Sequence, residues 1–405
     1  MLATTNRRQG KLLCQDQRGR ASRHCMACLL LALIFVLAGC GPITVKRTTA
    51  VSTVVAVAPT LPAQAFPNAA DLDAYLSHLN ASGSLTGSVL VAHNGMLFSK
   101  GYGLADRDAR IPDTPQTRFR IGSVTKEFTA MAILILQERG KLHVQDRLCL
   151  YIANCPQDWR PITLSHLLTH SSGIPDYTNF PDFIATWTQP TTPEQLIARF
   201  KDRPLDFPPG SVFRYSNSGY VLLGYIIERV SGETYATFLH EHIFAPLKMR
   251  NSGYDTTHPA LPQHATGYYS DYSKPDPYDM SIVYAAGAVY STVEDLYIWD
   301  RALMSHMLVS QQALDAMFTP HIPCPRPGAG GGCLQSTDRG YGYGWFIGAE
   351  PLGKLIYHVG RVDGFFAYNG FYPARNLYVV VLCNLETADV MKIGRTLASM
   401  VTGSG

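Results

Sequence analysis

The chain has 405 residues, 46% of them hydrophobic, and a formal net charge of +3, so it can bury a large core as one large domain or two ordinary ones. Residues 1–39 contain six Lys or Arg and one Asp, a balance of +5, which leaves about −2 for Cys40 onward. The body of the chain therefore gives nucleic-acid binding no electrostatic support.

The first 39 residues are typical of a bacterial signal peptide. Basic residues precede the apolar run 27–38, which is too short to span a bilayer comfortably. The run ends in Leu37-Ala38-Gly39-Cys40, which resembles a lipobox, where the peptide is cut before a cysteine that receives lipid. We expect a periplasmic protein with a lipid anchor at Cys40, and Gly41 favours the outer membrane. The alternative interpretation of the apolar run is a short core helix, and the alternative start of the chain is Met26.

The stretch 40–67 predicts a flexible tether, because it is rich in Thr, Val, Ala and Pro and has only two charged residues. Residues 68–405 are then the folded domain. Within it, 71–79 predicts a short amphipathic helix. The segment 88–100 predicts a β-hairpin that turns at Asn94-Gly95, residue types that tolerate positive φ.

The segment around residues 121–140 predicts a helix that begins at a serine. Ser123 can cap the N-terminus, Glu127 is an acid in the first turn, and Gly140 can end the helix in a left-handed conformation. The middle is apolar on every side, which indicates burial. Ser123 and Lys126 share one face, one turn apart, and a buried Lys has a lowered pKa that lets it accept a serine proton. A capped helix with an ordinary lysine has the same Ser-x-x-Lys pattern, so this pair needs support from elsewhere.

Residues 130–290 are mostly helical in pattern and predict a helical lobe punctuated by Pro and Gly. A helix is expected over 219–230, ending near Gly232. Just before it, a loop carries a phenol and a carboxamide, Tyr215 and Asn217. These side chains could serve as a proton shuttle and an amide donor.

Two close cysteine pairs are candidate disulfides in an oxidising compartment: Cys149 with Cys155, and Cys324 with Cys333. Cys383, inside an apolar run, is expected to be a small buried residue. A zinc site of His321, Cys324 and Cys333 is possible on residue type alone, but its spacing matches no established ligand pattern. We therefore predict no metal and no cofactor.

The C-terminal part returns to short strands and closes with a helix over 390–401. The strands are expected at 343–347, 354–359, 365–372 and 377–383. Strands at both ends with helices between them predict an α+β (α/β/α) fold. Its antiparallel sheet is built from both chain ends and flanked by helices, and a mostly helical lobe is inserted.

Three motifs stand in order along this chain: Ser123-x-x-Lys126, Tyr215-x-Asn217 and His358-x-Gly360. They resemble the three motifs of the serine β-lactamase and penicillin-binding protein superfamily, and are most similar to its class C β-lactamase, esterase and D-aminopeptidase-like branch. The resemblance runs from about residue 70 to 400. Tyr177-Thr-Asn179, His93-Asn-Gly95 and Lys392-Ile-Gly394 fit the same short patterns, but their sequence context disfavours each of them.

The resemblance implies a role for each residue. Ser123 would attack an ester or amide carbonyl while Lys126 and Tyr215 share the proton, and Tyr215 would then protonate the leaving group and activate water. Asn217 would hold Lys126 and the substrate amide. The backbone N–H groups of Ser123 and Arg361 would form the oxyanion hole.

The third motif departs from the pattern of most relatives. His358 stands where β-lactamases and penicillin-binding proteins usually carry Lys, and Val359 where they carry Thr or Ser. A neutral imidazole offers little to a substrate carboxylate, and Arg361 is either its replacement or simply a solvent-exposed side chain. We therefore expect a serine hydrolase of small-molecule or peptide substrates, esters or peptide amides ahead of β-lactams, and possible peptidoglycan fragments among them. The alternatives are a class C-like β-lactamase, a slow-deacylating penicillin-binding protein, or a non-catalytic cell-wall-binding lipoprotein.

Overall fold

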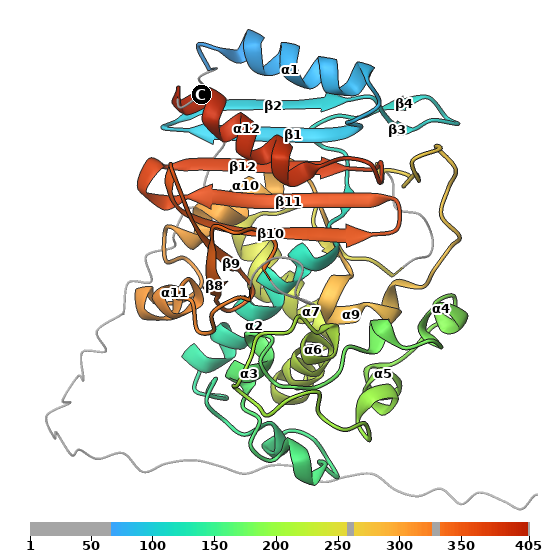
Figure 1. The fold of residues 1–405 in the computed structure, drawn as a ribbon, viewed down its shortest axis with the longest axis vertical. Coiled ribbons are helices and arrows are strands. Elements are labelled where there is room, and N and C mark those ends of the chain that lie inside the picture. The colour runs from blue at the N-terminus through green and yellow to red at the C-terminus, as the bar shows by residue number, and fades with distance from the viewer. Residues whose placement is uncertain (1–65, 257–262, 326–332, 404–405) are drawn as a thin grey trace, which may run out of the picture. The chain divides into compact units, whose positions relative to one another are not determined.

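The computed structural model describes residues 66–256, 263–325 and 333–403, which lie within one compact unit (Figure 1). The leader, Cys40 and nearly all of the tether are outside these ranges, so the signal peptide, the lipid anchor and the periplasmic location stay predictions. Within the described ranges, no helix combines the length and apolarity needed to cross a bilayer.

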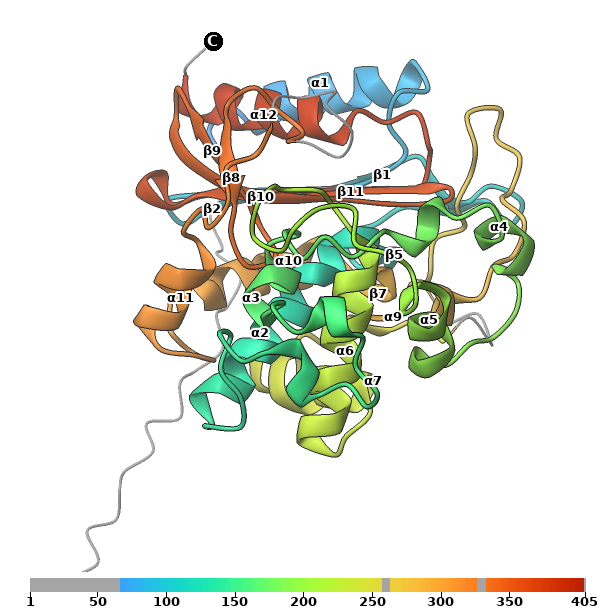
Figure 2. The same cartoon turned by 60° about the horizontal axis from the view of Figure 1, so that its bottom comes forward.

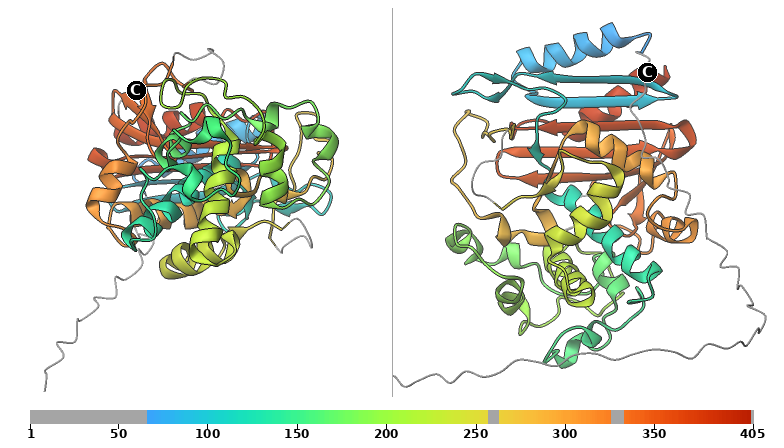
Figure 3. Two further views of the ribbon diagram at one scale, coloured as in Figure 1. Left: turned by 90° about the horizontal axis from the view of Figure 1, so that it is seen from below. Right: turned by 180° about the vertical axis from the view of Figure 1, so that it is seen from behind.

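A seven-stranded antiparallel sheet forms the centre of the fold, in the order β2-β1-β12-β11-β10-β9-β8. The first strands of the chain lie beside the last, with Val91 opposite Val379, as the view from behind in Figure 3 shows. The predicted α+β fold with a sheet built from both chain ends is therefore confirmed. The strands are β1 (Gly87–His93), β2 (Met96–Tyr102), β8 (Asp338–Tyr341), β9 (Phe346–Glu350), β10 (Gly353–Val362), β11 (Phe365–Tyr372) and β12 (Leu377–Cys383).

Both faces of this sheet are buried, which explains why β12 is an unbroken apolar run. Successive side chains of a strand point to opposite faces. Val379 and Val381 join the core beneath α1 (Ala69–Ala81) and α12 (Val390–Thr402). Val380 and Leu382 join the larger core with α2 (Thr125–Glu138) and α10 (Val293–Leu303). Figure 2 shows these two helix layers on either side of the sheet.

The lobe between the two halves of the sheet is mostly helical, as expected. Its longest helix, α6 (Asn217–Ser231), ends at Gly232 with φ +79°. The other helices are α3 (Leu164–Leu168), α4 (Phe183–Thr186), α5 (Pro193–Phe200), α7 (Tyr235–Leu239), α8 (Ala245–Leu247) and α9 (Tyr284–Gly287), and α11 (Gln311–Met317) follows α10. Short strands complete the chain: β3 (Leu104–Asp106), β4 (Ile111–Pro112), β5 (Phe119–Arg120), β6 (Gly253–Tyr254) and β7 (Val289–Ser291).

Two local predictions are wrong. Residues 343–347 do not form one strand, because the chain turns at Gly344 with φ +82° and β9 begins only at Phe346. Ser123 does not cap α2 through its side chain; it lies in a 3₁₀ turn, η1 (Gly122–Val124), that leads into the helix. Its hydroxyl is thereby left available to other partners.

Both predicted cysteine pairs are disulfide-bonded, Cys149 to Cys155 and Cys324 to Cys333, and Cys383 is buried. Because Cys324 and Cys333 are bonded to each other, they are not zinc ligands. Among the residues of known position, no three His, Cys, Asp or Glu side chains gather as a metal site would require.

Glu127 is not a solvated first-turn acid but a fully buried one. Its Oε2 accepts hydrogen bonds from Trp299 Nε1 (2.9 Å) and Asn369 Nδ2 (3.0 Å), and the same amide group donates to Asp300 Oδ1 (2.9 Å). Burial raises the pKa of the Glu127 carboxyl well above its usual value, and the charge of Asp300 raises it further. This network joins α2 to α10 and β11.

Glu127→Gln tests this burial. The folded protein keeps a proton on Glu127 that the unfolded chain releases above about pH 4, so unfolding releases a proton and wild-type stability falls as pH rises. One such proton corresponds to about 1.4 kcal/mol per pH unit. As pH rises from 5 to 8, the free energy of unfolding measured by urea denaturation should fall less in Glu127→Gln than in wild type. In Glu194→Gln, on the surface, it should fall as it does in wild type. An unchanged slope in Glu127→Gln would contradict a protonated Glu127.

Candidate active site

The site forms where β10 meets the start of α2, and two glycines permit that contact. A Cβ atom on Gly360 would lie 1.8 Å from the Ile121 carbonyl oxygen and 3.1 Å from the Ser123 nitrogen. A Cβ atom on Gly122, whose φ is +49°, would lie 2.7 Å from the Arg361 nitrogen. Two backbone segments can approach this closely only at glycine residues, which have no side chain. The approach brings the backbones of Gly122-Ser123 and Gly360-Arg361 together, which is compatible with Ser123 and Arg361 as a pair of oxyanion donors.

Lys126 lies at the centre of the polar contacts. Its Nζ is 3.0 Å from Ser123 Oγ, 2.9 Å from Asn217 Oδ1 and 2.8 Å from the Ala286 carbonyl oxygen. Its side chain is fully buried. Burial lowers the pKa of Lys126 to about 7, and the charge of Asp176 partly offsets this effect.

These three contacts assign the lone pair of the neutral amine. Asn217 Oδ1 and the Ala286 carbonyl can only accept, so each takes one of the two N–H groups that neutral lysine has. The lone pair is then directed at the Ser123 hydroxyl. A neutral Lys126 in this geometry is placed to remove the Ser123 proton.

Asp176 and Thr178 fix the Asn217 amide, and the sequence analysis did not identify either residue. Asn217 Nδ2 donates to Asp176 Oδ2 (3.0 Å) and to Thr178 Oγ1 (3.3 Å), which turns its oxygen toward Lys126. A buried carboxylate accepts but does not donate, so the amide orientation is unambiguous. The signal in the sequence was an Asp directly before Tyr177-Thr-Asn179, a segment that was disfavoured because Tyr177 lacks a preceding Pro-Gly and a following helix.

Tyr215 packs beside Lys126, whose Nζ is 4.8 Å from the centre of the phenol ring. Burial raises the pKa of Tyr215 well above its usual value, and the Ser123 hydroxyl partly offsets that shift. His170 packs on the other side, with ring centroids 4.1 Å apart, and its Nδ1 accepts from the Ser216 backbone N–H at 3.1 Å. Tyr215 is therefore a protonated phenol that can donate a proton, and Lys126 is the better base.

His358 lies behind the site and has both ring nitrogens occupied. Nδ1 donates to the Val359 carbonyl (2.6 Å), and Nε2 then accepts from the Tyr341 hydroxyl (2.9 Å). Burial lowers the pKa of His358 to about 3, so the ring is neutral as expected. With 1% of its surface exposed, His358 positions the strand and has no free atom for a substrate.

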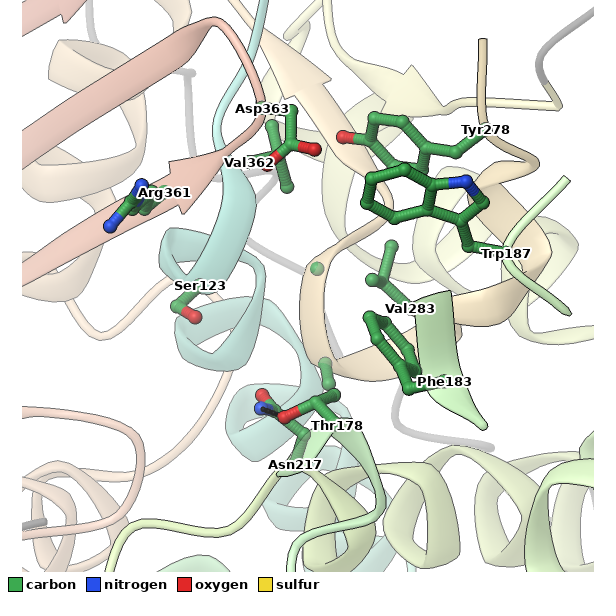
Figure 4. Close-up of a pocket in the computed structure, with 12 residues that line it drawn as sticks. Ser123, Thr178, Phe183, Trp187, Asn217, Tyr278, Val283, Arg361, Val362 and Asp363 are labelled. Atoms are coloured by element: carbon green, nitrogen blue, oxygen red, sulfur yellow. Dashed lines mark hydrogen bonds between the residues drawn. The ribbon is translucent and has the colours of Figure 1, made fainter. Parts of the chain in front are cut away.

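A cavity of about 210 Å³ opens beside Ser123 and is drawn in Figure 4. Arg361 borders it, but its guanidinium points away in that view and is bonded to Glu386. The predicted candidates thus separate into two groups: Ser123, Asn217 and Arg361 line the cavity, and Lys126, Tyr215, His358 and Gly360 do not.

The first residues of the three other segments that fit the short motif patterns do not belong to the predicted site. Tyr177 is fully buried, and its hydroxyl donates to the Ile282 carbonyl. His93 is the last residue of β1, at the hairpin turn, and Lys392 lies in α12. Tyr177, His93 and Lys392 do not line the cavity at Ser123, although Thr178, the middle residue of the first segment, does.

Comparison with known proteins gives consistent matches. A family model described as Beta-lactamase matches residues 72–399. The putative penicillin-binding protein PbpX of Bacillus subtilis is 33% identical over 315 residues, which are 77% of this chain and 73% of that protein. The octameric penicillin-binding protein homologue from Pyrococcus abyssi superposes with a TM-score of 0.74 at 32% identity, covering 83% of this chain and 78% of that one. A D-stereospecific amidohydrolase from Streptomyces sp. has a TM-score of 0.69 at 26% identity, with coverage of 84% and 100%.

The lowered pKa of Lys126 predicts how Ser123 reactivity depends on pH. Only neutral Lys126 accepts the serine proton, so labelling by a fluorophosphonate should accelerate about tenfold per pH unit below 7 and level off above it. Lys126→Arg, which stays charged, should label at least about 100-fold more slowly. Tyr215→Phe should keep the midpoint near 7, since the phenol is not the base. A rate that rises only above pH 9 would contradict this assignment.

Gly360→Ala should separate the two backbones, because its Cβ cannot coexist with the Ile121 carbonyl. Losing one oxyanion donor typically lowers turnover by about 100- to 1000-fold, and we expect a loss of that size in the labelling rate. Gly348→Ala in β9 is the matched control, because its Cβ would meet no atom closer than 3.4 Å. Circular dichroism checks that both variants fold. Wild-type labelling by Gly360→Ala would show that the close approach is not needed.

Proposed function

The chain belongs to the β-lactamase family and is a serine hydrolase, and we propose that it acts through an acyl-serine intermediate on ester or peptide amide substrates, as a carboxylesterase or D-amino acid peptidase. The observation that carries this proposal is the set of three contacts made by buried Lys126, with Ser123, Asn217 and Ala286. They support an activated serine.

In the proposed first step, Ser123 Oγ attacks the substrate carbonyl carbon and its proton passes to neutral Lys126. The negative charge that develops on the carbonyl oxygen is stabilised by the backbone N–H groups of Ser123 and Arg361. As the tetrahedral intermediate collapses, the bond to the leaving group breaks and Tyr215 protonates the departing oxygen or nitrogen. Lys126 then returns a proton to Tyr215, which leaves an acyl-enzyme and a neutral lysine.

Water completes the proposed cycle. It attacks the acyl carbon while its proton passes through Tyr215 to Lys126, and the Ser123 alkoxide leaves as it regains that proton. The high pKa of Tyr215 supports a relay role for the phenol and a base role for the amine. No cofactor or metal enters any of these steps.

The charges around the cavity support esters and peptide amides ahead of β-lactams. A penicillin or a D-Ala-D-Ala peptide carries a carboxylate, which a cation in the site would have to neutralise. His358 is neutral and enclosed, and the Arg361 guanidinium is engaged by Glu386. The solved relative described as a D-stereospecific amidohydrolase is consistent with an amide substrate.

A penicillin-binding role with slow deacylation is the second candidate, because relatives of this chain bear that name. It requires the same acylation chemistry and differs only in the fate of the acyl-enzyme. A non-catalytic cell-wall-binding role is disfavoured, since it needs no buried lysine bonded to the serine.

A substrate panel read by intact mass tests the proposal. We expect turnover of p-nitrophenyl esters and D-amino acid amides, a transient mass increase on the protein, and weak or no nitrocefin hydrolysis. Ser123→Ala should abolish both turnover and adduct, and the surface variant Ser77→Ala should retain them. A stable penicillin adduct without turnover would favour the second candidate. Equal activity in wild type and Ser123→Ala would overturn the acyl-serine mechanism.

A further inference from the structure

The cavity beside Ser123 contains a carboxylate that no described residue contacts through a hydrogen bond or ion pair. Asp363 lines the cavity, is partly buried, and receives no hydrogen bond or ion pair from the described residues. In Figure 4 its carboxylate points over the cavity toward Tyr278. Partial burial raises the pKa of Asp363, the charge of Glu386 adds to the effect, and the charge of Arg361 partly offsets it. A carboxylate in this position is stabilised by a cation.

The cations that share a cavity with Asp363 each pair with another carboxylate. Lys274, which lines a second cavity together with Asp363, is bonded to Asp108 at 2.5 Å. Arg361 is bonded to Glu386, and Arg120 is bonded to Asp255 at 2.7 Å. The Arg120 guanidinium also lies over the Tyr278 ring, 5.3 Å from its centre. The charge that this wall offers to a bound molecule is therefore negative.

The position of Asp363 is fixed by the turn that contains it. Asp363 and Gly364 connect β10 to β11, and Gly364 has φ +79°. A Cβ atom on Gly364 would lie 2.7 Å from the Gly267 carbonyl carbon, so the turn packs backbone against backbone. The Tyr268 backbone N–H also donates to the Gly364 carbonyl at 3.4 Å. The carboxylate is held at the end of the strand that supplies the oxyanion donor Arg361.

The proposed mechanism leaves this cavity for the acyl part of the substrate. The leaving group must reach the Tyr215 hydroxyl that protonates it, and Tyr215 does not line this cavity. The opposite wall is aromatic, formed by Phe183, Trp187 and Tyr278. A cavity of roughly 150 Å³ is enough to hold benzene, so about 210 Å³ accommodates a phenyl-sized side chain with a small polar group beside it.

We propose that Asp363 binds the ammonium group of an amino-acyl substrate whose apolar side chain packs against Phe183, Trp187 and Tyr278. This inference rests on the proposed function, because it assigns the acyl group that Ser123 would receive. The carboxylate and the aromatic faces both attract a cation, and the same charge disfavours acyl groups that carry a carboxylate. Asp363 is thus a specificity-determining residue for free α-amino acids in amide or ester linkage.

Two isosteric substrates test the assignment. Phenylalanine p-nitroanilide, in both enantiomers, carries the ammonium group, and 3-phenylpropanoyl p-nitroanilide lacks only that group. In wild type, kcat/KM for one phenylalanine enantiomer should be at least about tenfold higher than kcat/KM for the 3-phenylpropanoyl substrate. Asp363→Asn should lower kcat/KM for that enantiomer at least about tenfold and leave kcat/KM for the 3-phenylpropanoyl substrate at its wild-type value. Asp276→Asn, which removes an acidic charge from a neighbouring cavity, is the control for a general field effect.

A binding measurement makes the test independent of catalysis. In calorimetry, 2-phenylethylamine should bind wild type at least about tenfold more tightly than 2-phenylethanol, and Asp363→Asn should abolish the difference. If no substrate is turned over, the proposed function fails and calorimetry still decides the ammonium site. Three results would overturn the inference: equal affinity of the two ligands for wild type, equal losses on both substrates in Asp363→Asn, or an equal effect of Asp276→Asn.

Discussion

The burial of Lys126 is the constraint on which the rest of the site depends. Burial removes the hydration of a protonated amine and so disfavours its charged form, and the pKa of the amine falls toward neutrality. The two obligatory acceptors, Asn217 Oδ1 and the Ala286 carbonyl, then turn its lone pair to Ser123. Asp176 acts in the opposite direction by favouring the charged form, and it also orients Asn217. The reactivity of the serine therefore follows from a balance between burial and one nearby carboxylate.

The second requirement is the close contact between β10 and η1, which joins a C-terminal strand of the sheet to the start of α2. Strand β10 brings Arg361 to Ser123 only because Gly122 and Gly360 have no side chains. Beneath this contact, the network of Glu127, Asn369 and Asp300 joins the helix to the sheet. Catalytic geometry and fold stability thus share the same few residues. Asp363 directly follows the same strand, so one element carries both the proposed oxyanion donor and the charge that we propose selects the acyl group.

Much of this arrangement was predictable from local patterns. The hairpin at Asn94-Gly95, the helix ending at Gly232 and the three spaced motifs each depend on short-range chemistry that a sequence displays. What was not predictable depends on contacts between distant segments. In the sequence, Glu127 is an ordinary acid in the first turn of a helix. Its partners Trp299 and Asn369 are more than 170 positions away along the chain and contact it only in the folded protein. Asp176 and Asp363 carry no motif, and the engagement of Arg361 by Glu386 is visible only once the chain is folded.

The central claim is that Lys126 is neutral near physiological pH, and its titration can be measured directly. Selective ¹³C labelling of lysine side chains, with Lys126→Arg to assign the signal, lets NMR follow the Lys126 ε-carbon from pH 5 to 11. The account predicts a midpoint at about pH 7, matching the midpoint of Ser123 reactivity. A Lys126 that titrates near pH 10, as an exposed lysine does, would contradict it.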